Sequence, residues 1–270
     1  MQIGIFAKTF PGSDPAKVLA TAAAAGFDGV QYNMACSGLD PLPTTITAAQ
    51  AKAVAQATRT THQHLFALSG TWNMIHPDPA LRALGQQRLA VLAAAAPAMG
   101  TRLITLCTGT RDPQDQWRRH PDNTTPAAWA DLLSAFEVAL QTAETHDILL
   151  GVEPELANVV NSAASARRLI DTLGSPRLRI VLDPANLFET EPDHTDIIAR
   201  AVDLLADRVV MAHAKDRAPD GSFATAGKGV INFAKFLRRL RSANFTGPVV
   251  THGLTAPEAP GVAAFLKSLI

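Results

Sequence analysis

A short β-branched segment, a loop and an amphipathic helix recur eight times along the 270 residues. Such alternation is typical of a parallel sheet wound by crossover helices, and eight strands are the number that closes the sheet into a barrel. The expected strands are Ile3–Phe6, Gly29–Tyr32, His64–Ser69, Leu103–Leu106, Leu149–Glu153, Leu178–Leu182, Val209–Ala212 and Val249–Thr251. The sequence therefore predicts an α/β protein with a single (β/α)8 TIM barrel domain over residues 1–270.

Helix boundaries support the same architecture. Asp14 and Asp78 each precede a proline, the expected start of a helix, whereas Gly26 and Gly174 stand where helices should end. The remaining helices are expected near 47–60, 162–173, 195–205, 233–242 and 259–269, and one more is expected to start near Thr125-Pro126. A doubly wound open sheet is the alternative, but residues 4–12 lack the glycine-rich fingerprint of that fold.

Charge balance restricts the partners. The chain has 24 basic and 24 acidic residues, which argues against non-specific nucleic-acid binding and against a polybasic membrane surface. Its most apolar stretch, Leu89–Met99, is too short to span a bilayer. Cys36 and Cys107 form no C-x-x-C pair, and no basic start or signal core precedes the first strand. We expect a soluble cytoplasmic protein.

Polar residues end four consecutive strands. Glu153 and Glu155 follow the fifth strand, Asp183 the sixth, His213 the seventh and His252 the eighth. Barrel enzymes build their active sites at this end of the strands, and two carboxylates with two imidazoles suit Mn²⁺, Zn²⁺, Co²⁺ or Fe²⁺. The alternative is that these side chains are polar plugs that cap the barrel core. We favour a metal site, because charged groups are rarely buried unless they are paired or bind a metal.

Four of these segments resemble the xylose-isomerase-like TIM barrels, a superfamily that includes sugar (phosphate) isomerases and epimerases. The segments are Glu153-Pro154-Glu155, Leu182-Asp183-Pro184, His213-Ala214-Lys215-Asp216 and Val249-Val250-Thr251-His252-Gly253-Leu254. The resemblance covers essentially the whole chain, in order. It implies one divalent metal ion (Mn, Zn, Mg, Co or Fe) held by Glu153, Asp183 and His213. The fourth family ligand is generally Glu, and His252 stands in its place.

The resemblance further implies a metal-dependent isomerase or epimerase that acts on a sugar, keto-sugar or related polyol through an enediolate. Glu153, or Glu155 as a second choice, is the expected base. His252 is expected either to bind the metal or to act as an acid or base. A homo-oligomer is compatible with the resemblance, because many relatives form dimers or tetramers.

Further residues are candidates for binding the substrate, each with a structural alternative. Asn73 and His76 follow the third strand, where the family often places a substrate-facing residue, but they also suit a loop cap and a surface histidine. Asn186 stands where relatives often carry a histidine, and it could instead cap a turn. Lys215 and Arg217 could bind an anionic or hydroxylated substrate, or pair with nearby aspartates at small energetic benefit.

Other activities remain as alternatives. The loss of the second glutamate at His252 favours a metal-dependent lyase or hydrolase of the same superfamily, for example on a 3-keto-glycoside. An apurinic-endonuclease type would need a basic face, which the neutral charge argues against. The alternative outside the enzymes is a non-catalytic sugar-binding barrel. Cys107 and the glycine-rich segment 226–229 are interpreted as a buried residue and a turn.

Overall fold

The computed structural model describes residues 1–270, and its main feature is a closed barrel of eight parallel strands. Around the barrel the order is β1-β10-β7-β6-β5-β4-β3-β2, so strands that are neighbours along the chain pair with one another. The barrel strands are β1 (Ile3–Phe6), β2 (Gly29–Tyr32), β3 (His64–Ser69), β4 (Leu103–Leu106), β5 (Leu149–Val152), β6 (Leu178–Leu182), β7 (Val209–Ala214) and β10 (Val249–Thr251). The predicted (β/α)8 fold is confirmed.

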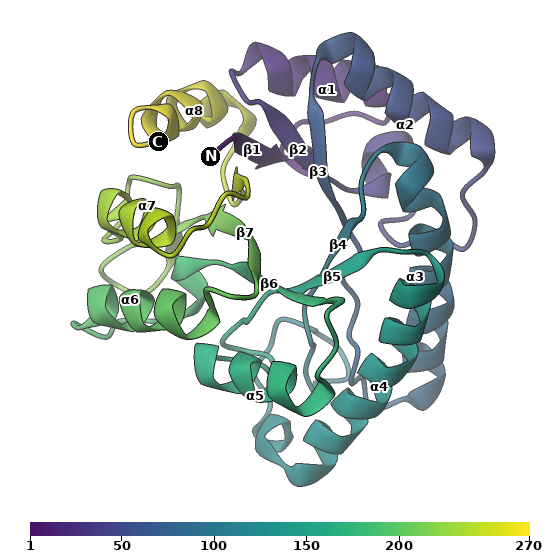
Figure 1. The fold of residues 1–270 in the computed structure, drawn as a ribbon, viewed down its shortest axis with the longest axis vertical. Helices are drawn as coiled ribbons and strands as arrows, with labels where there is room; N and C mark the ends of the chain where they lie inside the picture. The colour runs from purple at the N-terminus through teal and green to yellow at the C-terminus, as the bar shows by residue number, and fades with distance from the viewer.

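Eight helices form a ring outside the strands, from α1 at the top of Figure 1 clockwise to α8. They are α1 (Pro15–Ala24), α2 (Ala48–Thr61), α3 (Pro79–Met99), α4 (Pro126–Thr145), α5 (Ala163–Leu173), α6 (His194–Leu205), α7 (Phe233–Ser242) and α8 (Ala259–Lys267). None of them combines the length and the apolar character needed to cross a membrane.

The predicted helix signals act as expected. The side chains of Asp14 and Asp78 accept hydrogen bonds from the backbone N–H groups of Ala16 and Ala80, and a proline occupies the first turn of each helix. Gly174 ends α5 with a φ of 61°, which glycine adopts without strain.

Some boundaries were predicted wrongly. The strand β7 continues to Ala214, β5 ends one residue before Glu153, and α6 begins at His194. The predicted loop after β7 contains an antiparallel hairpin of β8 (Asp216–Arg217) and β9 (Phe223–Ala224). Two-residue strands give no periodic pattern, so the sequence offered no signal for this hairpin.

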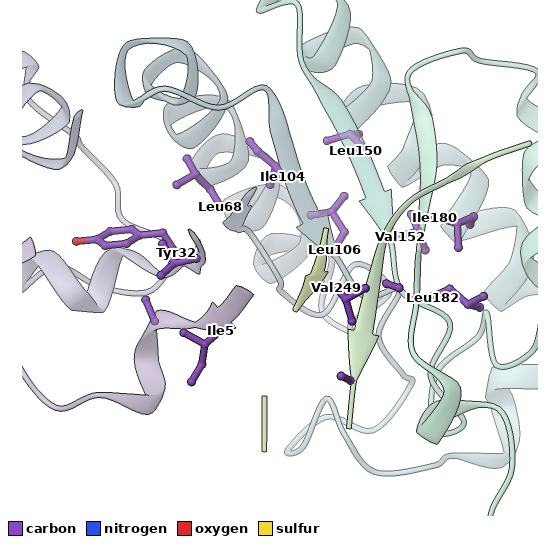
Figure 2. Packing of buried hydrophobic residues seen from close by; sticks show 14 of the residues in the cluster. Ile5, Tyr32, Leu68, Ile104, Leu106, Leu150, Val152, Ile180, Leu182 and Val249 are labelled. Atoms are coloured by element: carbon purple, nitrogen blue, oxygen red, sulfur yellow. The ribbon is translucent and has the colours of Figure 1, made fainter. Parts of the chain in front are cut away.

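Two hydrophobic clusters follow from the alternation of side chains along each strand. The larger one, of 67 buried residues, lies between the strands and the helices; Figure 2 shows part of it, including Leu106, Leu150 and Ile180. The smaller one consists of Ala67, Leu103, Val181, Met211 and Val250 and contains no helix residue. It therefore fills the interior of the barrel, and polar side chains lie one step further along the strands.

Two helical glycines test the packing in opposite directions. A Cβ on Gly85 in α3 would lie 2.1 Å from Cδ1 of Trp72, whereas a Cβ on Gly261 in α8 would meet no atom within 4 Å. We expect Gly261→Ala to stabilise the protein by up to about 1 kcal/mol through helix propensity. Gly85→Ala should destabilise it by about 1–3 kcal/mol, because the overlap outweighs the same gain. Midpoints of urea unfolding measure both effects; equal stabilisation by the two variants would contradict the packing of Trp72 against α3.

Candidate metal centre at the barrel mouth

Strand alternation positions four polar side chains over the barrel interior. Each lies two residues beyond an inward-facing position of its own strand, and a two-residue step keeps a side chain on the same face. The pairs are Gly151 and Glu153, Val181 and Asp183, Met211 and His213, and Val250 and His252. Because all eight strands are parallel, these residues meet at one end of the barrel.

The four side chains form a tight cluster that could hold a metal ion. One ligand atom from each of Glu153, Asp183, His213 and His252 lies within 4.8 Å of the others. Ligand atoms on opposite sides of one ion, each at about 2.2 Å, are about 4.4 Å apart, so small side-chain shifts suffice. The side chain of Asp183 has no exposed surface and that of His213 has 3%, whereas Glu153 has 12% and His252 has 21%. A ligand therefore approaches the cluster past Glu153 and His252.

A buried chain of hydrogen bonds orients the His213 ring. The Gln31 amide donates from Nε2 to Thr105 Oγ1 at 2.9 Å, which turns its Oε1 toward His213 Nε2, also at 2.9 Å. Since Oε1 can only accept, His213 carries its proton on Nε2. The other ring nitrogen, Nδ1, faces Glu153 Oε1 at 3.1 Å. A proton on Nδ1 forms a hydrogen bond to Glu153, and once that proton is lost the lone pair and the carboxylate are both free to bind a metal cation, so the donor set fits a metal.

The pKa of His213 agrees with that arrangement. Burial by itself lowers this pKa, but the charge of Glu153 and its hydrogen bond, together with Asp183, outweigh burial, so the net direction is upward. A group that attracts a proton at Nδ1 in the absence of metal is also suited to attract a metal cation there.

Asp183 and His252 form the other half of the cluster, with His252 Nε2 at 2.9 Å from Asp183 Oδ2. Burial raises the pKa of Asp183, but Lys215 and His252 counteract it and hold the pKa well below its usual range. Burial and the neighbouring His213 lower the pKa of His252. Asp183 is therefore an anion and His252 a neutral imidazole, the forms in which both groups bind metals.

Asn186 and Lys215, both predicted to bind substrate, contact this cluster. Asn186 donates from Nδ2 to Glu153 Oε1 at 2.8 Å and accepts from Lys215 Nζ at 2.8 Å. Lys215 Nζ is 3.5 Å from Asp183 Oδ2 and 3.8 Å from the ring centroid of Phe223. A buried ammonium group is thus fixed beside Asp183 and is linked to Glu153 through Asn186.

The remaining predicted residues are held by nearby backbone. Arg217 donates from Nε to the carbonyl of Ala185, and its guanidinium lies over Phe223. Glu155 accepts hydrogen bonds from Ala157 N and Asn158 Nδ2, and burial raises its pKa. Its carboxylate therefore serves the turn after β5, and it makes no hydrogen bond to the cluster.

Asn73 and His76 connect two loops. The amide of Asn73 donates to the carbonyl of Thr110 and accepts from its N–H, and His76 Nε2 contacts the carbonyl of Pro113. Neither makes a hydrogen bond to the cluster. These contacts hold the loop after β3 against the loop after β4.

Sequence reasoning missed Gln31, Asn158 and Phe223. Gln31 lies two residues after Gly29 on β2, and a polar residue at an inward strand position was a usable signal. Asn158 and Phe223 lie in loops, where spacing gives no direction. The glycine-rich segment after β9 is a turn, as predicted, and it binds an internal anion: Asp216 Oδ2 accepts from the N–H groups of Gly227 and Gly229.

Fold and site define a barrel protein with a metal-type cluster at the C-terminal ends of its strands. The chain belongs to the xylose isomerase-like TIM barrel family, whose sequence pattern matches residues 19–269. No curated protein sequence matches the chain.

Several solved structures share the fold. The 3-keto-D-glucoside 4-epimerase from E. coli superposes with a TM-score of 0.79 and 19% identity, over 99% of both chains. An L-ribulose 3-epimerase has a TM-score of 0.77 and 18% identity, over 99% of this chain and 93% of that one. The D-psicose 3-epimerase from Clostridium cellulolyticum H10, solved with D-tagatose, has a TM-score of 0.76 and 15% identity, over 100% and 99%. At such identities the likeness establishes the fold, and activity has to be argued from the site.

Both cysteines are buried, and burial raises the pKa of Cys36 to about 11 and that of Cys107 well above its usual range. Because the thiolate is the reactive form, we expect neither thiol to react quickly with Ellman's reagent at pH 8 in the folded protein. Both should react after denaturation in guanidinium. Rapid modification of one thiol in the native state would contradict the burial and reopen Cys107 as a nucleophile.

Proposed function

We propose that the protein is a metal-dependent isomerase or epimerase of a sugar, keto-sugar or related polyol. The observation that carries the proposal is the cluster of two carboxylates and two imidazoles at the barrel mouth, in which His213 Nδ1 lies 3.1 Å from Glu153 Oε1. Likeness to epimerases of free and glycosidic keto-sugars supports this class of substrate.

Glu153, Asp183, His213 and His252 would hold the ion. A divalent ion at this position supplies Lewis acidity toward a carbonyl and its neighbouring hydroxyl. The mixed oxygen and nitrogen donors suit Mn²⁺, Zn²⁺, Co²⁺, Fe²⁺ or Mg²⁺ without a sharp choice among them.

Glu153 is the proposed base. Its Oε1 accepts the hydrogen bond from Asn186, whereas its Oε2 has no hydrogen-bond partner in the protein. The partly exposed side chain can therefore direct Oε2 toward a substrate and take the proton α to its carbonyl. Asn186 fixes the carboxylate and prevents it from rotating away from the mouth.

Lys215 is proposed to stabilise the enediolate that this proton transfer forms. Its ammonium is held by Asn186 on one side and shielded by the Phe223 ring on the other, so its charge acts in a poorly hydrated setting. Arg217, Asn73 and His76 remain proposals for substrate binding at the edge of the mouth.

The replacement of the second glutamate by His252 bears on the reaction type. A single carboxylate can move a proton between adjacent carbons on one face, which is isomerisation; epimerisation needs a donor on the opposite face, a role that His252 would have to take. The presence of one carboxylate and one ammonium also favours a second candidate, elimination from a keto-glycoside, which needs one base and one acid.

Metal binding can be tested with Asp183→Asn. Asparagine keeps the oxygen that caps Ala185 N but loses the anionic charge that faces the other ligands. We expect at least about a 100-fold loss of Mn²⁺ or Zn²⁺ affinity in competition with a chelator. The control is Asp131→Asn, because Asp131 lies on α4 and is paired with Arg82 and Arg111. This variant should bind metal as the native protein does. Native affinity in Asp183→Asn would refute the proposed centre.

The base can be tested by proton exchange in D₂O. With metal bound, a keto-sugar should acquire deuterium at its α-carbon, followed by NMR or mass spectrometry. Glu153→Gln at saturating metal should lower the exchange rate by about 10²–10⁴-fold, because the amide cannot accept the proton. Exchange at the native rate in this variant would transfer the role to Glu155 or His252. Absence of exchange with every keto-sugar tried would argue against the isomerase.

A further inference from the structure

A cleft lies between α6 and α7, which are neighbours in the helix ring outside the strands (Figure 1). Its volume is about 260 Å³, close to the lower end of the range for small-molecule sites. Its lining residues belong to the two helices and to the residue that caps α7, and none of them is part of the candidate metal centre. We refer to it as the α6–α7 cleft.

The floor of the cleft is apolar. Ile198 on α6 is 5% exposed and Phe236 on α7 is 2% exposed, and Ala199 lies beside Ile198 on the same helix. Burial of apolar surface against these side chains is favourable, so the floor can bind the organic part of a ligand.

Positive charge surrounds this floor. Three cations of α7, Lys235, Arg238 and Arg239, line the cleft, and no acidic residue does. Only Arg239 forms an ion pair, with Asp203 through Nε and Nη2, which leaves its Nη1 free. The side chains of Lys235 and Arg238 form no hydrogen bond and no ion pair in the protein. An anion in the cleft therefore meets charge that no carboxylate neutralises.

Neutral donors complete the lining. The hydroxyl groups of Thr195 and Ser242 make no hydrogen bond in the protein, and the amide of Asn232 uses only its Oδ1, which accepts from Lys235 N. Each of these three side chains therefore keeps a donor available for a ligand.

This combination favours a phosphate monoester over other anions. Such a group carries a charge of about −1.5 to −2 at pH 7 and offers three strong acceptor oxygens. Arginine and lysine bind phosphate through charge-assisted hydrogen bonds, and the neutral donors can bind its remaining lone pairs. A carboxylate has a single charge and two oxygens, so it would match fewer of the cations and donors.

We propose that the α6–α7 cleft binds a small organic phosphate monoester, with the phosphate among the cations of α7 and the organic part on Ile198 and Phe236. The site is separate from the candidate metal centre, and its existence does not depend on the proposed function.

A ligand in this cleft would join two helices that begin beside the loops of the mouth. The ring of His194, the first residue of α6, stacks on Phe188 with the centroids 4.8 Å apart, and its Nε2 lies 3.3 Å from the carbonyl oxygen of Val230. Because the ester would bind only the folded arrangement of α6 and α7, it should raise the temperature of unfolding.

Calorimetric titration of the metal-loaded protein with phenyl phosphate tests the cleft. Phenyl phosphate should bind saturably and more tightly than inorganic phosphate, because its ring can reach the apolar floor. The double variant Lys235→Gln/Arg238→Gln should weaken its binding at least about tenfold, because it removes both unpaired cations. The matched control, Lys17→Gln/Lys52→Gln, removes the same charge from exposed positions of α1 and α2 and should bind as the native protein does.

Ala199→Leu tests the floor without any change of charge. The larger side chain should occupy space above Ile198 and weaken phenyl phosphate more than inorganic phosphate. Thermal unfolding gives a second measurement, since phenyl phosphate should raise the melting temperature of the native protein more than that of Lys235→Gln/Arg238→Gln.

Three results would overturn the proposal: no binding of phenyl phosphate, equal weakening by the control and by Lys235→Gln/Arg238→Gln, or native affinity in Ala199→Leu. A fourth uses Asp183→Asn. Loss of phenyl phosphate binding in this variant, with native affinity in Lys235→Gln/Arg238→Gln, would mean that the ester binds at the metal centre and that the cleft is not its site.

Discussion

The closure of the barrel between β1 and β10 is the constraint on which the site depends. Ile3, Gly4 and Ile5 pair in register with Val249, Val250 and Thr251, so the first and last barrel strands have no free edge toward each other. Closure forces the ends of β5, β6, β7 and β10 to face a common axis. The polar residues that lie two positions beyond the interior cluster therefore come together. The free-energy cost of their charge repulsion and desolvation has to be offset by other groups.

That compensation comes from cations and donors fixed around two buried carboxylates. Lys215 and His252 face Asp183, and Asn186 donates to Glu153. His213 Nδ1 faces Glu153 Oε1, so the carboxylate stabilises positive charge at this contact, whether it is a proton or a metal ion. Gln31 binds the far side of the ring and holds Nδ1 in this direction.

The loops around the mouth are ordered from within by carboxylates. Asp216 accepts four backbone N–H groups and fixes the segment after β7, which carries the hairpin with Phe223 over Lys215. Asp112 does the same for the turn that presents Trp117. The rigid barrel thus supplies the groups of the candidate metal centre, whereas the loops, each fixed by its own carboxylate, shape what can approach them.

The sequence by itself determined the eight alternating units, most of the element boundaries and the four strand-end residues, because periodicity and capping act over a few residues. Only the tertiary structure decided that Asn186 and Lys215 contact the cluster, that Asn73 and His76 connect two loops, and that Gln31 orients His213. Those outcomes depend on side chains that lie 29 to 182 residues apart in the chain, and no local pattern specifies the direction in which such a side chain points.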